Sequence, residues 1–122
     1  MSAHETDQIR QYILKGGMIF ADPQYNWQAS FLEWCRRLFP DERLIPLDNS
    51  EDDIYTSRYT FTVPPQFWSG NRSYLGLKHG DRWVIICDRG RMADGWKSPI
   101  NEDCVKMGIN IIDYANAHMM SR

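Results

Sequence analysis

The sequence predicts an α/β domain in which helices flank a mostly parallel sheet in three layers. Two observations predict it. An amphipathic helix, a glycine pair and an apolar strand follow one another over residues 2–22, and a second amphipathic helix follows over 28–39. Towards the end, a strand hairpin is followed by a long helix. Helices that alternate with short apolar strands are typical of layered α/β folds. At 122 residues, we expect a single domain over 1–122.

The first helix has clear start and stop signals. Ser2 and Glu5 have the spacing of a capping box, and apolar side chains then recur at helical spacing at Ile9, Tyr12 and Ile13. Gly16 and Gly17 end the helix, and one of them is expected to have a positive φ. The apolar run 18–21 predicts a strand that is covered on both faces, as in parallel sheets.

The middle of the chain has one well-marked helix and one irregular stretch. The helix over 28–39 is expected to bury Phe31, Trp34, Cys35 and Leu38. Pro40 closes it, and 44–47 fits a short strand. Residues 48–70 have no clear period. They fit a lid or binding segment, or an irregular layer that covers the core with its aromatic side chains.

The last part of the chain reads as a hairpin, a polar loop and a helix. The strands are expected at 73–77 and 82–87 around Gly80–Asp81, and the helix over 101–119. Its buried face is predicted to be Val105, Gly108, Ile109, Ile112, Ala115 and Met119, with Gly108 in close contact with the sheet. The stripe Lys106, Asn110, Tyr114 and His118 is expected opposite, as a solvated face or a protein-contact surface.

Composition disfavours several classes of function. The formal net charge is −2 without a basic patch, which disfavours a nucleic-acid partner. No apolar run approaches the roughly 18 residues of a membrane span, and no signal-peptide pattern is present. We therefore expect a cytoplasmic protein. The cysteines form no CxxC pair, which predicts free core thiols at Cys35, Cys87 and Cys104 rather than a zinc or redox site.

Four segments together resemble a known family. They are IRQYILKGGMIFAD (9–22), FLEWCRRLFP (31–40), IPL (45–47) and, after a loop with Gly95–Trp96, GINIIDYANAH (108–118). This combination resembles the bacterial family labelled domain of unknown function 4159. The resemblance implies a fold similar to the class I glutamine amidotransferase-like α/β domains, which are flavodoxin-like. Because the family has no established activity, it implies no reaction.

The resemblance also implies an incomplete sheet. Members of the family usually carry further strands before the first helix seen here, so 1–122 is expected to be a truncated form or the C-terminal part of a larger domain. An exposed sheet edge or apolar face would remain, and a partner subunit or a second copy of the chain would cover it.

Amidotransferase-like enzymes place their nucleophile on a tight turn between a strand and a helix. The corresponding turn here, residues 20–24, contains neither Cys nor Ser. Pro23 fixes its own φ and favours extended geometry at Asp22, which disfavours the strained turn. Nucleophilic hydrolase or amidotransferase chemistry is therefore not expected.

The candidate site is at the ends of two predicted strands. Asp22 ends one strand and Asp88 another, and Arg89, Arg91 and Trp96 follow in the loop. Ligands of open α/β sheets bind at the carboxyl ends of the strands. If both strands point the same way, these five residues line one crevice, where the arginines could hold a small anion.

Two other interpretations of these residues stay open. Asp22 can cap the next helix or pair with Arg89 or Arg91 for stability alone. A magnesium or calcium ion between Asp22 and Asp88 has thin support, so neither a metal nor a cofactor is predicted. The overall prediction is a non-catalytic module that binds a protein partner or a small anion. The alternative is a hydrolase-type enzyme that uses Asp22 as its general base.

Overall fold

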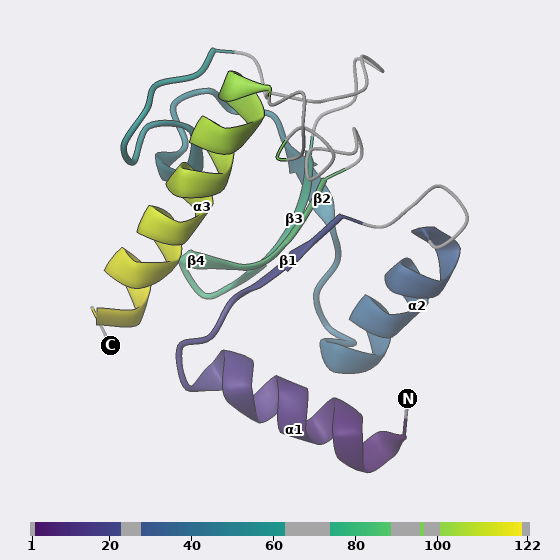
Figure 1. Ribbon diagram of the computed structural model, residues 1–122. Helices are drawn as coiled ribbons and strands as arrows, with labels where there is room; N and C mark the ends of the chain where they lie inside the picture. The colour runs from purple at the N-terminus through teal and green to yellow at the C-terminus, as the bar shows by residue number, and fades with distance from the viewer. Residues whose placement is uncertain (1, 23–27, 63–73, 89–95, 97–100, 121–122) are drawn as a thin grey trace.

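The computed structural model describes residues 2–22, 28–62, 74–88, 96 and 101–120, and the side chains of all of these except 28, 119 and 120. Its elements, in chain order, are α1 (Ala3–Leu14), β1 (Ile19–Ala21), α2 (Gln28–Leu38), β2 (Ile45–Leu47), the 3-10 helix η2 (Asp53–Tyr55), β3 (Tyr74–His79), β4 (Arg82–Cys87) and α3 (Glu102–Met120). Helices surround a mixed open sheet (Figure 1), so the predicted α/β class is confirmed.

The sheet differs from the mostly parallel one that the sequence predicts. Its described strands have the order β1-β4-β3-β2. Only β1 and β4 are parallel, whereas β3 is antiparallel to both β4 and β2. The cause is local, because the tight turn at Gly80, with φ 66°, makes β3 and β4 a hairpin and therefore antiparallel.

Both ends of α1 form as the sequence predicts. Ser2 Oγ accepts a hydrogen bond from Glu5 N, and Ser2 N donates to Glu5 Oε1, both at 3.1 Å. At the other end, Gly16 has φ 113°, which confirms the predicted left-handed stop. Arg82 then donates to the carbonyls of Ile13 and Gly17, the latter at 2.8 Å. The end of α1 is thereby tied to the start of β4.

Helices cover both faces of the sheet, α3 on one and α1 with α2 on the other (Figure 1). The cluster under α3 joins sheet residues to Cys104, Met107, Ile111 and Tyr114. The cluster under α1 and α2 joins Leu77, Val84 and Ile85 to Ile13, Cys35, Leu38 and Phe39. The predicted core thiols are confirmed, since all three cysteines are buried and none forms a disulfide. None of the helices in the described ranges has the length and apolar character needed to cross a membrane.

The described part of the irregular stretch, 48–62, is a layer that closes the core. Tyr55 is buried and its hydroxyl donates to the carbonyl of Leu47. Asp52 accepts two bonds from Trp83 Nε1, at 3.0 and 2.9 Å, and also caps η2. These contacts favour the structural interpretation for 48–62, while 63–70 lie outside the described residues.

The predicted buried face of α3 is wrong. The buried residues are Cys104, Met107, Asn110, Ile111 and Tyr114, while Val105, Gly108 and Ile109 are half-buried and Ile112 is 61% exposed. The helix carries apolar residues on two adjoining faces, and periodicity alone could not choose between them. Two members of the stripe that was expected opposite, Asn110 and Tyr114, are buried instead. Gly108 lies under the indole of Trp96 rather than against the sheet.

Candidate functional site

The carboxyl ends of β1 and β4 lie side by side. The two strands pair in parallel with Ala21 opposite Cys87, and Asp88 N donates to the carbonyl of Ala21 at 2.9 Å. Asp22 and Asp88 therefore follow directly after adjacent strands that point the same way. This is the juxtaposition on which the predicted crevice depends.

Both carboxylates are shielded from water. Asp88 is fully buried, and Oδ1 of Asp22 is buried although the residue as a whole is half-buried. Side chains alternate along a strand, so Asp22 lies on the same face as Phe20, which packs against the cluster under α3. The pair thus belongs to the α3 side of the sheet.

A buried phenol and a buried thiol share this end of the sheet. Tyr74 begins β3, one position beyond the pair Leu75–Cys87, which sets it beside Asp88. Burial, and after it the negative charge of Asp88, raises the pKa of Tyr74 far above its usual value. Burial also raises the pKa of Cys104 to about 11, with Asp88, Asp103 and Asp22 contributing in that order. Both groups stay protonated at neutral pH, so they can donate hydrogen bonds but are poor nucleophiles.

The start of α3 adds backbone groups to the same region. Asn101 Oδ1 accepts a bond from Cys104 N at 3.2 Å, as an N-cap residue does. Trp96 Nε1 donates to the carbonyl of Cys104 at 2.8 Å. Its ring lies over Gly108, and its centroid is 5.9 Å from that of Phe20. Trp96 is therefore fixed between β1 and α3.

The structure brings together three of the five predicted site residues, Asp22, Asp88 and Trp96, at one end of one sheet face. Arg89 and Arg91 lie outside the described residues, and their part in the site stays a prediction. Sequence reasoning missed Tyr74 and Cys104. Tyr74 could have been found by extending the hairpin register to Asp88, whereas Cys104 required the correct buried face of α3. In the described ranges, no group of three or more His, Cys, Asp or Glu side chains could hold a metal.

An apolar groove of about 440 Å³ begins at Trp96 and Phe20 and follows the outer side of α3. Its remaining described walls are Val105, Gly108, Ile109, Ile111 and Ile112, so no charged side chain from the described part of the chain lines it. Ile112 and Trp96 are 61% and 41% exposed. The groove is next to β1, which is the last strand at its end of the described sheet. Exposed apolar surface beside an open strand edge is typical of an interaction site.

Comparison with known protein families supports the resemblance that the four sequence segments carry. The model of the family described as Domain of unknown function (DUF4159) matches residues 1–115. This chain belongs to that family. A search of curated proteins returned no match. Membership in DUF4159 assigns no activity, so the function of this DUF4159 domain must be inferred from its surfaces.

Proposed function

We propose that this DUF4159 domain is a non-catalytic protein-interaction module and that its partner is a second copy of the chain. The observation that carries the proposal is the apolar groove between β1 and α3, with Ile112 exposed at its margin. Covering such a surface removes apolar area from water, at roughly 25 cal/mol per Å². The raised pKa values of Tyr74 and Cys104 support a non-catalytic role, because both groups stay protonated at neutral pH and are then poor nucleophiles.

A second copy fits because the surface carries both halves of a reciprocal contact. Ile112 is one of the residues that line the groove and is 61% exposed, and the other lining residues are also apolar. A two-fold axis beside α3 would bring the Ile112 side chain of each copy against the groove of the other, as closed dimers require. The edge of β1 lies along the same surface, where two copies could extend one sheet.

The finer parts of the proposal concern fold and ligand. An amidotransferase-like arrangement is supported by the parallel pairing of β1 and β4, with carboxylates at their carboxyl ends. On this proposal Asp22, Asp88 and Trp96 would be the described part of a crevice, which the backbone bond from Asp88 to Ala21 and the bond from Trp96 to Cys104 support. Arg89 and Arg91 would complete that crevice by holding a small anion.

The association is tested by two lysine substitutions at similarly exposed isoleucines. Ile112→Lys places a charge in the groove, whereas Ile45→Lys places one on β2, at the opposite edge of the sheet, where Ile45 is 45% exposed. Sedimentation velocity should show a dimer for the native chain and for Ile45→Lys, and a folded monomer for Ile112→Lys. A native monomer at high concentration, or a dimer that survives Ile112→Lys, would refute the proposal.

A second candidate function is favoured by the adjacent carboxylates. A carboxylate at the end of a strand, next to a second carboxylate, is a residue type that can take a proton from water in general base catalysis. Asp22 would then activate water as the base of a hydrolase.

One variant, Asp22→Asn, distinguishes a general base from a residue that helps to bind an anion. If Asp22 is a general base, hydrolysis of chromogenic ester and amide substrates should fall by at least about a hundredfold. If Asp22 helps to bind an anion, a thermal shift caused by phosphate should disappear while native melting stays close to that of the parent. Ser30→Ala, at an exposed position on α2, is the matched control for handling and folding. Hydrolysis that persists in Asp22→Asn would exclude the enzymatic candidate.

A further inference from the structure

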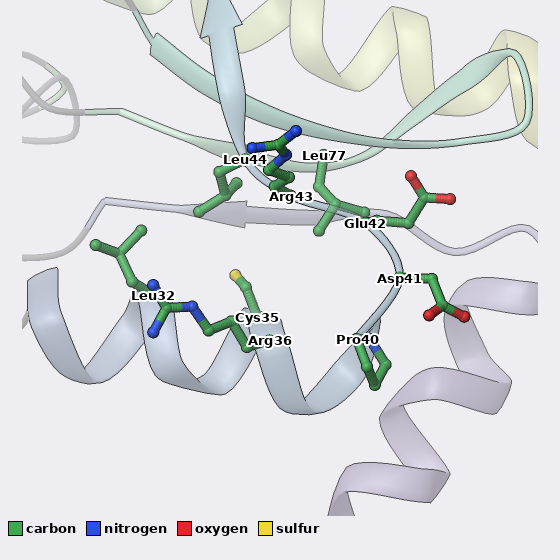
Figure 2. A pocket seen from close by; sticks show the side chains of 9 residues that line it. All are labelled: Leu32, Cys35, Arg36, Pro40, Asp41, Glu42, Arg43, Leu44 and Leu77. Atoms are coloured by element: carbon green, nitrogen blue, oxygen red, sulfur yellow. The ribbon is translucent and has the colours of Figure 1, made fainter.

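A second cavity lies on the other face of the sheet, away from α3 (Figure 2). It measures about 550 Å³ and is bounded by α2, by the connection 40–44 that leads to β2, and by Leu77 of β3. The connection starts with a turn in which Glu42 N donates to the carbonyl of Phe39 at 3.1 Å. The volume falls within the range of small-molecule sites in proteins.

The inner wall of this cavity is apolar. Leu32, Leu44 and Leu77 line it, and the sulfur of Cys35 points from α2 towards them (Figure 2). Burial raises the pKa of Cys35 to about 12, so the thiol is neutral and behaves as a small apolar group. This wall suits a hydrocarbon tail and offers almost nothing to a polar one.

Two exposed arginines border the cavity, Arg36 on α2 and Arg43 on the connection to β2 (Figure 2). Arg43 forms no hydrogen bond or ion pair with any residue that the structure describes. Within the same described ranges, Arg36 reaches only Glu33, at 3.4 Å, and both side chains are well exposed at 76% and 63%. An exposed pair of this length is weak and is easily exchanged for a better partner.

The nearby acidic side chains do not neutralise these arginines. The carboxylates of Asp41 and Glu42 line the far side of the cavity and point away from Arg36 and Arg43 (Figure 2). Among the described residues, neither carboxylate forms an ion pair. Figure 2 shows Arg36 on the α2 side of the apolar interior and Arg43 on the connection opposite, so the cavity has positive charge on two sides and an acidic side at Asp41 and Glu42.

From this arrangement of charge we infer that the cavity binds an amphipathic monocarboxylate, with its head group within reach of the exposed side chains of Arg36 and Arg43 and its hydrocarbon tail against Leu32, Leu44 and Leu77. Guanidinium groups recognise carboxylates with paired, charge-assisted hydrogen bonds. The tail gains by leaving water for the leucine wall. The acidic side excludes a second negative charge at the other end of the ligand. This site is separate from the α3 groove and does not depend on the proposed association.

Calorimetric titration with four probes tests the ligand class. Octanoate, below its micelle concentration, has the required head and tail. Octylamine has the same tail with the opposite charge, acetate has the head alone, and octyl phosphate has a different anionic head. Octanoate should bind, and octylamine and acetate should not. Octyl phosphate binding more tightly than octanoate would correct the head group to phosphate and overturn the carboxylate assignment.

Matched charge variants test the place of binding. Arg43→Gln should weaken octanoate binding by about tenfold or more, and Arg36→Gln should act in the same direction. Lys15→Gln removes one positive charge at the exposed end of α1, and should leave binding unchanged. Leu32→Asp, at a position 38% exposed, places a negative charge on the wall and should abolish binding without unfolding the chain.

Three results would overturn the inference. They are no heat of binding with octanoate, equal binding of octylamine, and binding that survives both Arg43→Gln and Leu32→Asp. If Ile112→Lys rather than Leu32→Asp abolished octanoate binding, the ligand would occupy the α3 groove, and the cavity under α2 would not be the site.

Discussion

The two sides of α3 differ in how far their side chains are buried and hydrogen-bonded. On the sheet side, Asn110 and Tyr114 are buried together with apolar residues, and their polar groups are bonded. Asn110 Oδ1 accepts from Arg58 N and Tyr59 N at 3.1 and 2.8 Å, and its amide donates to the carbonyls of Ile54 and Tyr59 at 3.2 and 2.7 Å. On the groove side, the lining is apolar and Ile112 stays largely in water.

The sheet side of α3 stabilises the fold, whereas the groove side is suited to interaction with another surface. A buried amide with its donors and acceptors bonded holds a loop in one place, because each bond would be costly to leave unmade. An apolar side chain exposed to solvent contributes little to the stability of the monomer, and it contributes favourable free energy only when another surface covers it. Substitutions on the sheet side should therefore change the free energy of unfolding, and those on the groove side should change association.

The largest expected effect is at Asn110. Asn110→Ala removes four bonds that fix the backbone between residues 54 and 59, and should lower the free energy of unfolding by about 3–5 kcal/mol. Asn110→Asp keeps an acceptor for the two backbone amides but sets its second oxygen against the carbonyls of Ile54 and Tyr59, so it should also lower the free energy of unfolding. Asn116→Ala, at an exposed position on the same helix, is the control. Urea denaturation measures all three, and equal costs at Asn110 and Asn116 would contradict the proposed role of the amide.

Two neighbouring isoleucines sharpen the comparison. Ile111 is 5% exposed and Ile112 is 61% exposed, on adjoining faces of the helix. At protein concentrations where the chain is monomeric, Ile111→Ala should cost about 2–4 kcal/mol, as large-to-small changes in cores do. Ile112→Ala should cost less than about 0.5 kcal/mol, as at most surface positions. Similar costs for the two variants would mean that the groove side is covered within the monomer.

A smaller loss is expected from Tyr114→Phe. The hydroxyl of Tyr114 accepts a bond from Trp83 N at 2.9 Å, within the buried part of β4. Phenylalanine keeps the ring and its stacking on His118 but leaves that amide without its acceptor, which should cost about 1–2 kcal/mol. Tyr12→Phe, at a ring 54% exposed, should have no measurable effect and serves as the control. Unfolding midpoints in urea compare the two.

The sequence predicts well whatever depends on short-range signals. The capping box of Ser2 and Glu5, the stop at Gly16 and the turn at Gly80 each fix an element through neighbours in the chain. The adjacency of Asp22 and Asp88 was also predictable, because it needs only two parallel strands that end side by side.

What failed depends on contacts between distant parts of the chain. The face that α3 buries is decided by the backbone of residues 54–59, which has no periodicity to read and which Asn110 binds. Without that contact, Asn110 and Tyr114 look like surface residues, and Cys104 cannot be assigned to the candidate site. Tyr74 is a different case, because its place beside Asp88 follows from the register of the hairpin and could have been predicted.

An effect confined to alkaline pH is expected from Cys104, where the sheet side of α3 meets the candidate site. Its pKa is raised from 9.0 to about 11, first by burial and then by Asp88. Below pH 9 the thiol is protonated in both folded and unfolded chains, and its contribution to stability is complete. Between pH 9 and 11 the unfolded thiol ionises while the folded one does not, so the unfolded state is favoured as pH rises.

The free energy of unfolding should therefore fall over this window by up to about 1.4 kcal/mol per pH unit for this thiol, because each pKa unit corresponds to that free energy. Cys104→Ala should lose this part of the slope. Cys35→Ala should lose the separate contribution of Cys35 to the slope, since burial raises the pKa of that thiol to about 12 on the opposite face of the sheet.

In an Asp88→Asn background, the slope due to Cys104 should end at a lower pH, because the charge that opposes ionisation of the folded thiol is gone. Asp103→Asn removes an exposed charge and should shift the end of this slope less. A slope that is the same with and without Cys104 would mean that this thiol ionises as readily in the folded chain as in the unfolded one, which its place against Asp22 and Asp88 does not allow.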